Sequence, residues 1–156
     1  MHPSTTSAAP LLLTAAIDAA VLGEDQPTPP ELTPWWQEGT TTPDGRRAIE
    51  LFVDNVATLE ARAAPLNRVA AAASLTDEEV VAVVAHHARL RHAGYRAYID
   101  TMHARGLLAV DADEATDVLL SLVGSDLFLV LTEDRGWSAQ RYAAWTTAAL
   151  CWLLLR

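Results

Sequence analysis

The sequence predicts an all-α fold of six to seven helices within a single domain, residues 1–156. Apolar residues recur at helical spacing along most of the chain, and the β-branched runs lie inside these helical patterns, so no strand is expected. Segments rich in proline or glycine separate the periodic stretches. Because 51% of the residues are hydrophobic, a chain of this length can bury a substantial core.

The N-terminal part is expected to contain one helix and a proline-rich loop. Residues 1–8 are small and polar and are predicted to form a disordered tail. A helix follows over residues 9–22 and ends at Gly23. The four prolines between residues 27 and 34 require a loop, after which the pair Trp35-Trp36 is expected to occupy one helical turn.

The central part is predicted to form three helices. The first covers residues 43–62, and its apolar stripe contains Ile49, Phe52, Val53, Val56 and Leu59. Pro65 is expected to break the chain before a short alanine-rich helix over residues 66–73. Thr76 precedes Asp77-Glu78-Glu79 in the pattern of a capping box, which predicts the start of the longest helix. That helix extends to about Arg105 and stops before Gly106.

The C-terminal part is predicted to contain two strongly apolar helices, over residues 112–131 and 138–155. An aspartate, Asp111 or Asp113, is expected to cap the first. Gly136 can adopt a positive φ after it, and Ser138 is a good N-cap for the second. A helix that is apolar nearly all round must be buried on more than one side. The rest of the domain can cover one side, and a second copy of the same helix pair can cover the other.

The segment between these two helices carries a family resemblance. Residues 131–142 read Leu-Thr-Glu-Asp-Arg-Gly-Trp-Ser-Ala-Gln-Arg-Tyr and are followed by Trp145. This resembles the penultimate turn of TetR-family regulators, in which an Arg-Gly-Trp-Ser run precedes Glu-Arg-Tyr or Gln-Arg-Tyr and a tryptophan. Together with the helix order, the resemblance extends over residues 9–155. It implies a C-terminal effector-binding and dimerisation domain, in which the last two helices of both subunits form a four-helix bundle.

The resemblance therefore implies a homodimer, whose interface is expected to contain Leu120, Val123, Leu127, Trp145 and Trp152. TetR-family proteins begin with a DNA-binding unit of three helices, for which this chain has no room. The chain is thus interpreted either as a fragment of a longer regulator or as a natural protein that lost this unit. With a net charge of -9, no lysine and scattered arginines, the chain is not expected to bind nucleic acid by itself.

Composition also bears on the compartment. The only cysteine, Cys151, excludes an internal disulfide, and a reducing cytoplasm is the expected location. The N-terminal leucine run lacks a preceding Lys or Arg, so no signal peptide is expected. No uninterrupted apolar segment is expected to reach membrane-spanning length, and no membrane contact is predicted. High alanine content with arginine-only basicity suggests a bacterial coding sequence.

Polar residues beside apolar helix faces are the candidates for ligand binding. Asn55 and Glu60 flank the stripe that contains Phe52 and Val56, and Asn67 follows Pro65. Such side chains either have structural partners or point into a cavity. The resemblance places an effector cavity inside the three central helices and thereby favours the second interpretation for Asn55 and Asn67. Trp36 and its neighbour Trp35 either gate that cavity or close one end of the core.

A second set of candidates lies along the longest helix. His87, Arg91 and Tyr95 share one stripe, and His87 could donate a hydrogen bond or act as a general base. Arg91 beside tyrosyl hydroxyls could orient an anionic or phenolic ligand. Alternatively, Arg91 pairs with a carboxylate such as Glu50 or Asp54 while the tyrosines pack in the core. No two histidines stand four residues apart, so neither a metal site nor a cofactor is predicted.

Two functions of different classes remain open on the sequence. The first is binding of a hydrophobic natural product or drug-like effector, as in the ligand-sensing half of a TetR-family transcriptional regulator. The second is a stand-alone enzyme of natural-product biosynthesis, which would use the same cavity for cyclisation, isomerisation or elimination by acid/base catalysis. His87, Tyr95 and Arg91 would then be the catalytic residues. No recognised catalytic motif is present, which argues against the enzyme.

Overall fold

The computed structural model describes residues 8–22 and 29–155. Over these residues the protein is all-α, with helices α1 to α7, two short helical turns and no strand, as the sequence predicted. One isolated antiparallel bridge joins Leu108 to Leu155. The predicted tail, apart from Ala8, and the helix stop at Gly23 lie outside the described residues.

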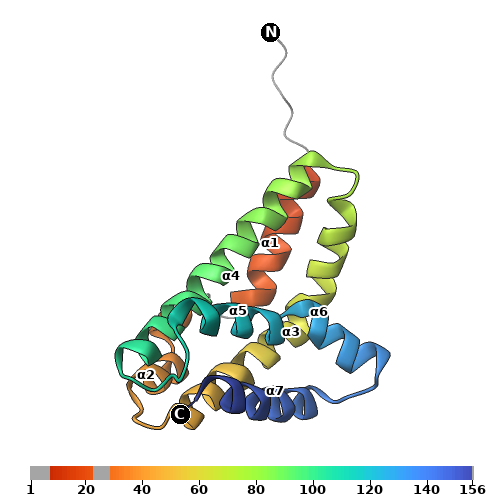
Figure 1. Ribbon diagram of the computed structural model, residues 1–156. Helices are drawn as coiled ribbons and strands as arrows, with labels where there is room; N and C mark the ends of the chain where they lie inside the picture. Colours follow the sequence, from red (N-terminus) through yellow and green to blue (C-terminus); the bar gives the residue numbers. More distant parts are fainter. Residues whose placement is uncertain (1–7, 23–28, 156) are drawn as a thin grey trace.

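The N-terminal elements agree with the predicted helix and loop. Helix α1 covers Ala8–Leu22, a single turn η1 covers Pro30–Leu32, and α2 covers Pro34–Thr41 (Figure 1). The predicted single turn at the Trp-Trp pair is therefore too short. Helix α2 persists because Pro34 occupies its first turn, where the missing N–H has no function, and the Thr33 hydroxyl accepts a hydrogen bond from the Trp36 N–H at 3.4 Å.

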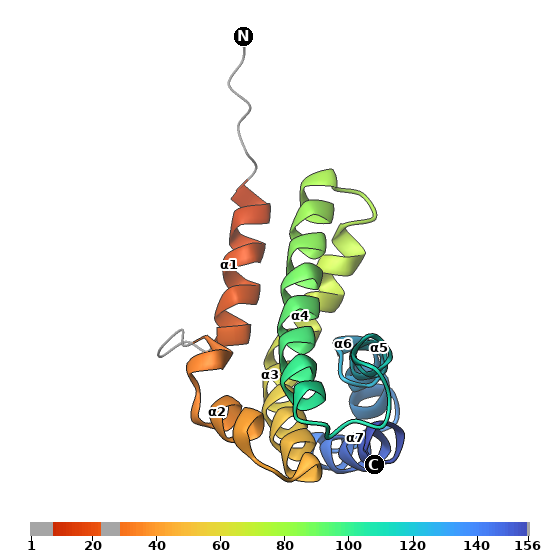
Figure 2. The same cartoon turned by 60° about the vertical axis from the view of Figure 1, so that its left-hand side comes forward.

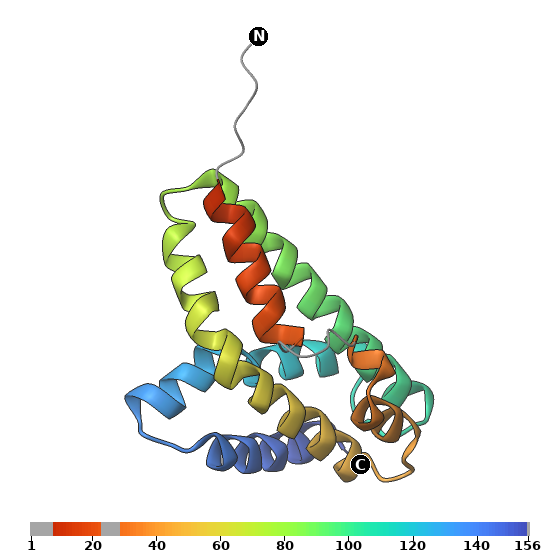
Figure 3. The same cartoon turned by 180° about the vertical axis from the view of Figure 1, so that it is seen from behind.

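Helix α3 covers Gly45–Ala73 without a break, so the predicted interruption at Pro65 is wrong. The proline removes one backbone N–H and leaves the carbonyl of residue 61 without its helical partner. Pro65 and Ala61 are both exposed, so water can solvate that carbonyl, and the alanine-rich sequence around them favours a helix. The helix changes direction along its length (Figure 3), as expected for a proline-containing helix.

Helix α4 covers Glu78–Ala104 and begins one residue later than the capping box predicted. The N-cap is Asp77 rather than Thr76, because the Asp77 carboxylate accepts hydrogen bonds from the N–H groups of Glu79 and Val80 at 2.9 and 3.4 Å. A carboxylate at this position also interacts favourably with the positive end of the helix dipole. Gly106 follows with a φ of 68°, which confirms the predicted stop.

The predicted single helix over residues 112–131 is wrong, because the chain breaks at Val123-Gly124. Helix α5 covers Ala112–Leu122, α6 covers Ser125–Leu129, and a π-helical turn covers Val130–Asp134. The break leaves the carbonyls of Leu122 and Val123 available, and the hydroxyls of Tyr142 and Tyr95 donate to them at 2.8 and 3.0 Å. Two buried tyrosines thereby provide hydrogen bonds to the carbonyls that lose their helical partners at the Gly124 break.

The same segment corrects the expectation that no apolar segment reaches membrane-spanning length. Residues Ala112–Asp134 are long and apolar enough to cross a membrane by length and composition. They do not form one straight helix, however, since α5 ends before an extended Gly124 with a φ of -167°. The core helices of water-soluble proteins meet the same criterion, so the finding does not by itself indicate a membrane span.

Helix α7 covers Ala139–Leu154, and its start agrees with the sequence prediction. The Ser138 hydroxyl accepts from the Arg141 N–H at 3.1 Å, and Gly136 has a φ of 68°. Trp137 packs over this turn: its ring meets Trp145 edge-on, and the Arg141 guanidinium lies 4.1 Å from its centroid. The sequence motif therefore forms one compact corner between the π-helical turn and α7.

The helices form two regions that share α3. Helices α1 and α4 run alongside the second half of α3, as Figures 1 and 3 show. Helix α7 lies along the first half of α3, and the short helices α5 and α6 lie between the two regions (Figure 2). The core lies where α3, α4, α5 and α7 meet, and its largest fully buried side chains include Val53, Tyr98, Ile99, Met102, Tyr142 and Leu150.

Candidate functional site

A cavity of about 1060 Å³ lies between α1, η1 with the start of α2, α3, α4 and the α5–α6 segment. Its walls contain all eight residues that the sequence predicted for a ligand site: Trp36, Phe52, Asn55, Val56, Asn67, His87, Arg91 and Tyr95. The structure thus brings together side chains from three helices, although the outermost two, Trp36 and Tyr95, are 59 positions apart in the sequence. Whether they bind a ligand stays a prediction.

Aromatic side chains build one end of the cavity. Trp36 is 9% exposed, and its ring packs edge-on against Tyr98 with the centroids 5.1 Å apart. Phe52 packs edge-on against Tyr95 at 4.9 Å and also contacts Trp35 at 6.2 Å. Trp36 therefore belongs both to the core and to the cavity wall, and gating of the cavity stays a prediction. Edge-to-face contacts of this kind are a favoured geometry of aromatic pairs and stabilise this end of the cavity.

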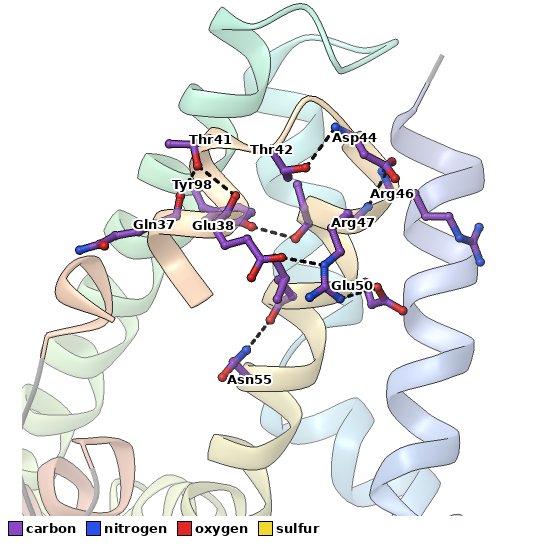
Figure 4. Close-up of polar contacts among 12 residues, drawn as sticks. Gln37, Glu38, Thr41, Thr42, Asp44, Arg46, Arg47, Glu50, Asn55 and Tyr98 are labelled. Carbon is purple, nitrogen blue, oxygen red and sulfur yellow. Dashed lines mark hydrogen bonds and ion pairs between the residues drawn. The ribbon is translucent and has the colours of Figure 1, made fainter. Parts of the chain in front are cut away.

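A polar corner supports this aromatic end from outside. The Arg47 guanidinium bridges Glu38 of α2 and Glu50 of α3 at 3.0 and 2.9 Å (Figure 4). Arg105 donates to the backbone carbonyls that end α2, among them that of Thr40 at 3.1 Å. In the same view, the Asn55 amide donates to the Leu51 carbonyl of its own helix at 2.7 Å. One donor of Asn55 is therefore used structurally.

The deepest polar group in the cavity wall is a carboxylate. Glu60 of α3 is only 2% exposed, and the Ser125 hydroxyl donates to one of its oxygens at 2.6 Å. The Asn67 amide in turn donates to the Ser125 oxygen at 3.0 Å. Burial raises the pKa of Glu60, the Ser125 hydrogen bond and the charge of Arg91 lower it, and the charge of Asp126 raises it further. Sequence reasoning noted Glu60 and Asn67 separately but did not connect them.

His87 is half-buried in the opposite wall. Its Nε2 atom is buried and has no hydrogen-bond partner among the described residues, and its Nδ1 atom is 3.8 Å from a carboxylate oxygen of Asp18 on α1. Burial lowers the pKa of His87, and His86 lowers it further, while Asp18 raises it. The net effect favours the neutral imidazole. His86 lies beside it, with the ring centroids 5.6 Å apart.

Tyr95 does not fit the acid/base role that the enzyme hypothesis gave it. Its hydroxyl donates to the Val123 carbonyl at 3.0 Å, so its proton is already in use. Burial also raises the pKa of Tyr95 far above its ordinary value. Arg91 is exposed at the cavity wall, and none of the ion pairs among the described residues involves it. The proposed pairing with Glu50 is not formed, because Glu50 binds Arg47.

The residues predicted for a dimer interface are split between three places. Val123 is fully buried in the core and cannot contact a partner chain. Leu120 and Leu127 are half-buried and line the cavity. Trp145 and Trp152 are 43% and 83% exposed on α7, so only these two lie where a second subunit could reach them.

Comparison with known proteins gives no independent assignment. No family model, no curated protein and no solved structure matches the chain. Within the described part of the chain, no three His, Cys, Asp or Glu side chains come close enough together to hold a metal ion. The cavity and its polar groups are therefore the basis for the functional argument.

Proposed function

We propose that the protein binds a hydrophobic small molecule in the cavity between α1, α3 and α4. The observation that carries the proposal is the cavity itself, whose volume of about 1060 Å³ exceeds what a drug-sized ligand needs. Its wall combines large apolar and aromatic side chains with a few polar groups, of which Glu60, Asn67 and His87 come from opposite sides. This is the composition typical of sites that enclose an apolar ligand and orient it through a few polar contacts.

The same proposal includes the biological setting that the resemblance implies. The chain would be the ligand-sensing domain of a bacterial, cytoplasmic protein similar to TetR-family regulators, without DNA binding of its own. The motif that carries the resemblance forms the corner before α7, where the Trp137 ring meets Trp145 edge-on and the Arg141 guanidinium lies over it. That corner supports the proposal because it orients α7 and the surface that α7 presents.

A homodimer through α7 is also part of the proposal, with a smaller set of residues than the sequence indicated. Trp145, Ala148 and Trp152 are three or four positions apart, share one face of α7 and are all exposed. Leu153 beside them is 40% exposed. An 83% exposed tryptophan is unusual for a monomer, and a twofold axis would let this face pack on itself. Sedimentation equilibrium should show a dimer for the wild type and a monomer for Trp152→Glu.

The enzyme remains a second candidate because of one observation. Within residues 8–22 and 29–155 the buried Nε2 of His87 has no hydrogen-bond partner, and a neutral imidazole is a competent general base. Tyr95 and Arg91 give this candidate little support, because the first has committed its proton and the second is exposed. Analysis of ligand recovered from the protein separates the two: a sensor returns the compound unchanged, whereas an enzyme returns it altered.

Gly94 allows a sharp test of the cavity. It lies on α4 in the cavity wall, and a Cβ added there meets no atom within 4 Å. Gly94→Leu should therefore place a side chain in the cavity without straining the backbone. Ala97→Leu on an exposed position of the same helix is the matched control.

The readout is saturable binding of Nile red, a neutral hydrophobic dye, followed by its fluorescence. The wild type and Ala97→Leu should bind it alike, and Gly94→Leu should bind at least about tenfold more weakly because the dye loses its apolar contacts. Trp152→Gln, which alters the exposed α7 face outside the cavity wall, should still bind the dye saturably. Unchanged binding by Gly94→Leu, or loss of binding in Trp152→Gln, would contradict the assignment of the site to this cavity.

A further inference from the structure

Glu60 is the only Asp, Glu, Lys or Arg that is buried among residues 8–22 and 29–155. A carboxylate removed from water is costly unless hydrogen bonds and an opposite charge compensate it. Glu60 lies on α3, lines the cavity and contacts Ser125 at the start of α6. A charged group placed at this depth therefore calls for a partner.

The protein supplies a hydrogen bond to Glu60 but, among the described residues, no ion-pair partner, and the charge of Arg91 acts on it only from a distance. The Asn67 amide donates to the Ser125 oxygen at 3.0 Å, so the Ser125 proton is directed to Glu60, which it reaches at 2.6 Å. This chain of donors stabilises the carboxylate form of Glu60. In the described part of the chain, no Arg or His side chain forms an ion pair with it.

The other charges around the cavity also favour a cation. Its wall contains the carboxylates of Asp18, Glu31, Glu60 and Asp126 and the guanidinium groups of Arg62 and Arg91. Arg62 is held at the rim, where its Nε donates to the Ala20 carbonyl of α1 at 3.0 Å. Arg91 is exposed and influences Glu60 only through space. Carboxylates are thus more numerous than guanidinium groups in the cavity wall, and the Glu60 carboxylate is the most deeply buried of these charged groups.

We infer that the ligand carries a protonated amine or another organic cation, which lies against the Glu60 carboxylate while the apolar body fills the space between α3 and α4. This inference rests on the proposed function and specifies its ligand class. It departs from the anionic or phenolic ligand that the sequence suggested for Arg91, because Arg91 is exposed whereas Glu60 is buried. A neutral hydroxyl could donate a hydrogen bond to an oxygen of Glu60, but it would not compensate the negative charge of the carboxylate.

Three probes that differ only in their polar end test the inference. They are 4-(biphenyl-4-yl)butylamine and the corresponding alcohol and carboxylate, titrated into the full chain by calorimetry at pH 7.5 and 0.15 M salt. Physiological salt suppresses the general attraction of a chain with a net charge of -9 for cations. The amine should bind roughly 10- to 100-fold more tightly than the alcohol, as expected for a hydrogen bond between charged groups.

Two variants connect this preference to Glu60. Glu60→Gln keeps the shape and can still accept from Ser125, so it should reduce amine binding to the level of the alcohol. Asp117→Asn removes one negative charge from an exposed position outside the cavity wall and should leave the preference unchanged.

The outcomes separate the inference from the proposed function. If none of the three probes binds, the proposed function itself is wrong. If they bind equally, or if the carboxylate binds most tightly, the cavity binds ligands but the inferred ligand class is wrong. The ratio of amine to alcohol affinity in the wild type decides this even if Glu60→Gln does not fold.

Discussion

Replacing Gly39 with alanine should destabilise the protein, although alanine is the better helix former. Gly39 lies buried in α2, directly against α4. A Cβ at this position would stand 1.9 Å from the hydroxyl oxygen of Tyr98 and 2.9 Å from the ring carbon that bears it. Tyr98 is 1% exposed and donates to the Ala48 carbonyl at 2.8 Å, so it has no open space into which to move. The added methyl group must therefore displace a buried ring or push α2 away.

The magnitude follows from three contributions. Loss of the Tyr98 hydrogen bond costs about 0.5–1.5 kcal/mol. Overpacking of a filled core costs about 1–3 kcal/mol. The higher helix propensity of alanine returns about 0.5–1 kcal/mol. The free energy of unfolding should thus fall by about 0.5–4 kcal/mol, which lowers the melting temperature by about 1–16 °C in a domain of this size.

Gly94→Ala is the matched control, because that glycine lies in α4 and an added Cβ meets no atom within 4 Å. It should raise the free energy of unfolding by about 0.5–1 kcal/mol. Both variants would be measured by urea denaturation followed by circular dichroism. A Gly39→Ala protein as stable as the wild type would show that α2 does not pack closely on Tyr98, and would refute the geometry of the aromatic end of the cavity.

Four further predictions concern single side chains. Burial raises the pKa of Glu60, so the charged form of Glu60 destabilises the fold increasingly as pH rises above the ordinary pKa near 4.5. Glu60→Gln removes this charge and should raise the urea midpoint at pH 7.5 but not at pH 4. The pKa of His87 is lowered from 6.5 by burial, so the wild type should lose stability as pH falls from 7 to 5, and His87→Phe should lose less. Arg105→Ala removes the donors at the end of α2 and should speed amide hydrogen exchange there without affecting α7. Ser138→Ala should lower the free energy of unfolding by about 1 kcal/mol through loss of the α7 N-cap, and an unchanged urea midpoint would contradict this.

The sequence predicted local features well where a local rule applies. Gly106 and Gly136 end their elements with positive φ, and Ser138 caps α7, because each depends only on neighbours in the chain. Pro65 shows the limit of such rules. A proline raises the free energy of a helix but does not forbid it, and a solvated carbonyl together with packing on both sides is enough to continue α3.

Two features of the site were beyond sequence reasoning for a different reason. The break at Gly124 is stabilised by Tyr95 and Tyr142, which lie 28 and 20 positions away from the carbonyls that they bind. The pair of Glu60 and Ser125 is separated by 65 positions. Helical periodicity grouped the residues of the cavity wall on α3 and on α4. It contains no information about which face meets which, so Leu120, Val123 and Leu127 were wrongly expected at a dimer interface.

Helix α3 has a consequence for how the two regions of the protein influence each other. Its second half lines the cavity with Glu60 and Asn67, and its first half packs along α7, with Pro65 between the two polar residues. A ligand that favours one curvature of α3 over another therefore also favours the position of α7 that packs against α3 in that curvature. Thermodynamic reciprocity then requires that any partner bound to α7 alters ligand affinity by the same factor by which the ligand alters partner binding.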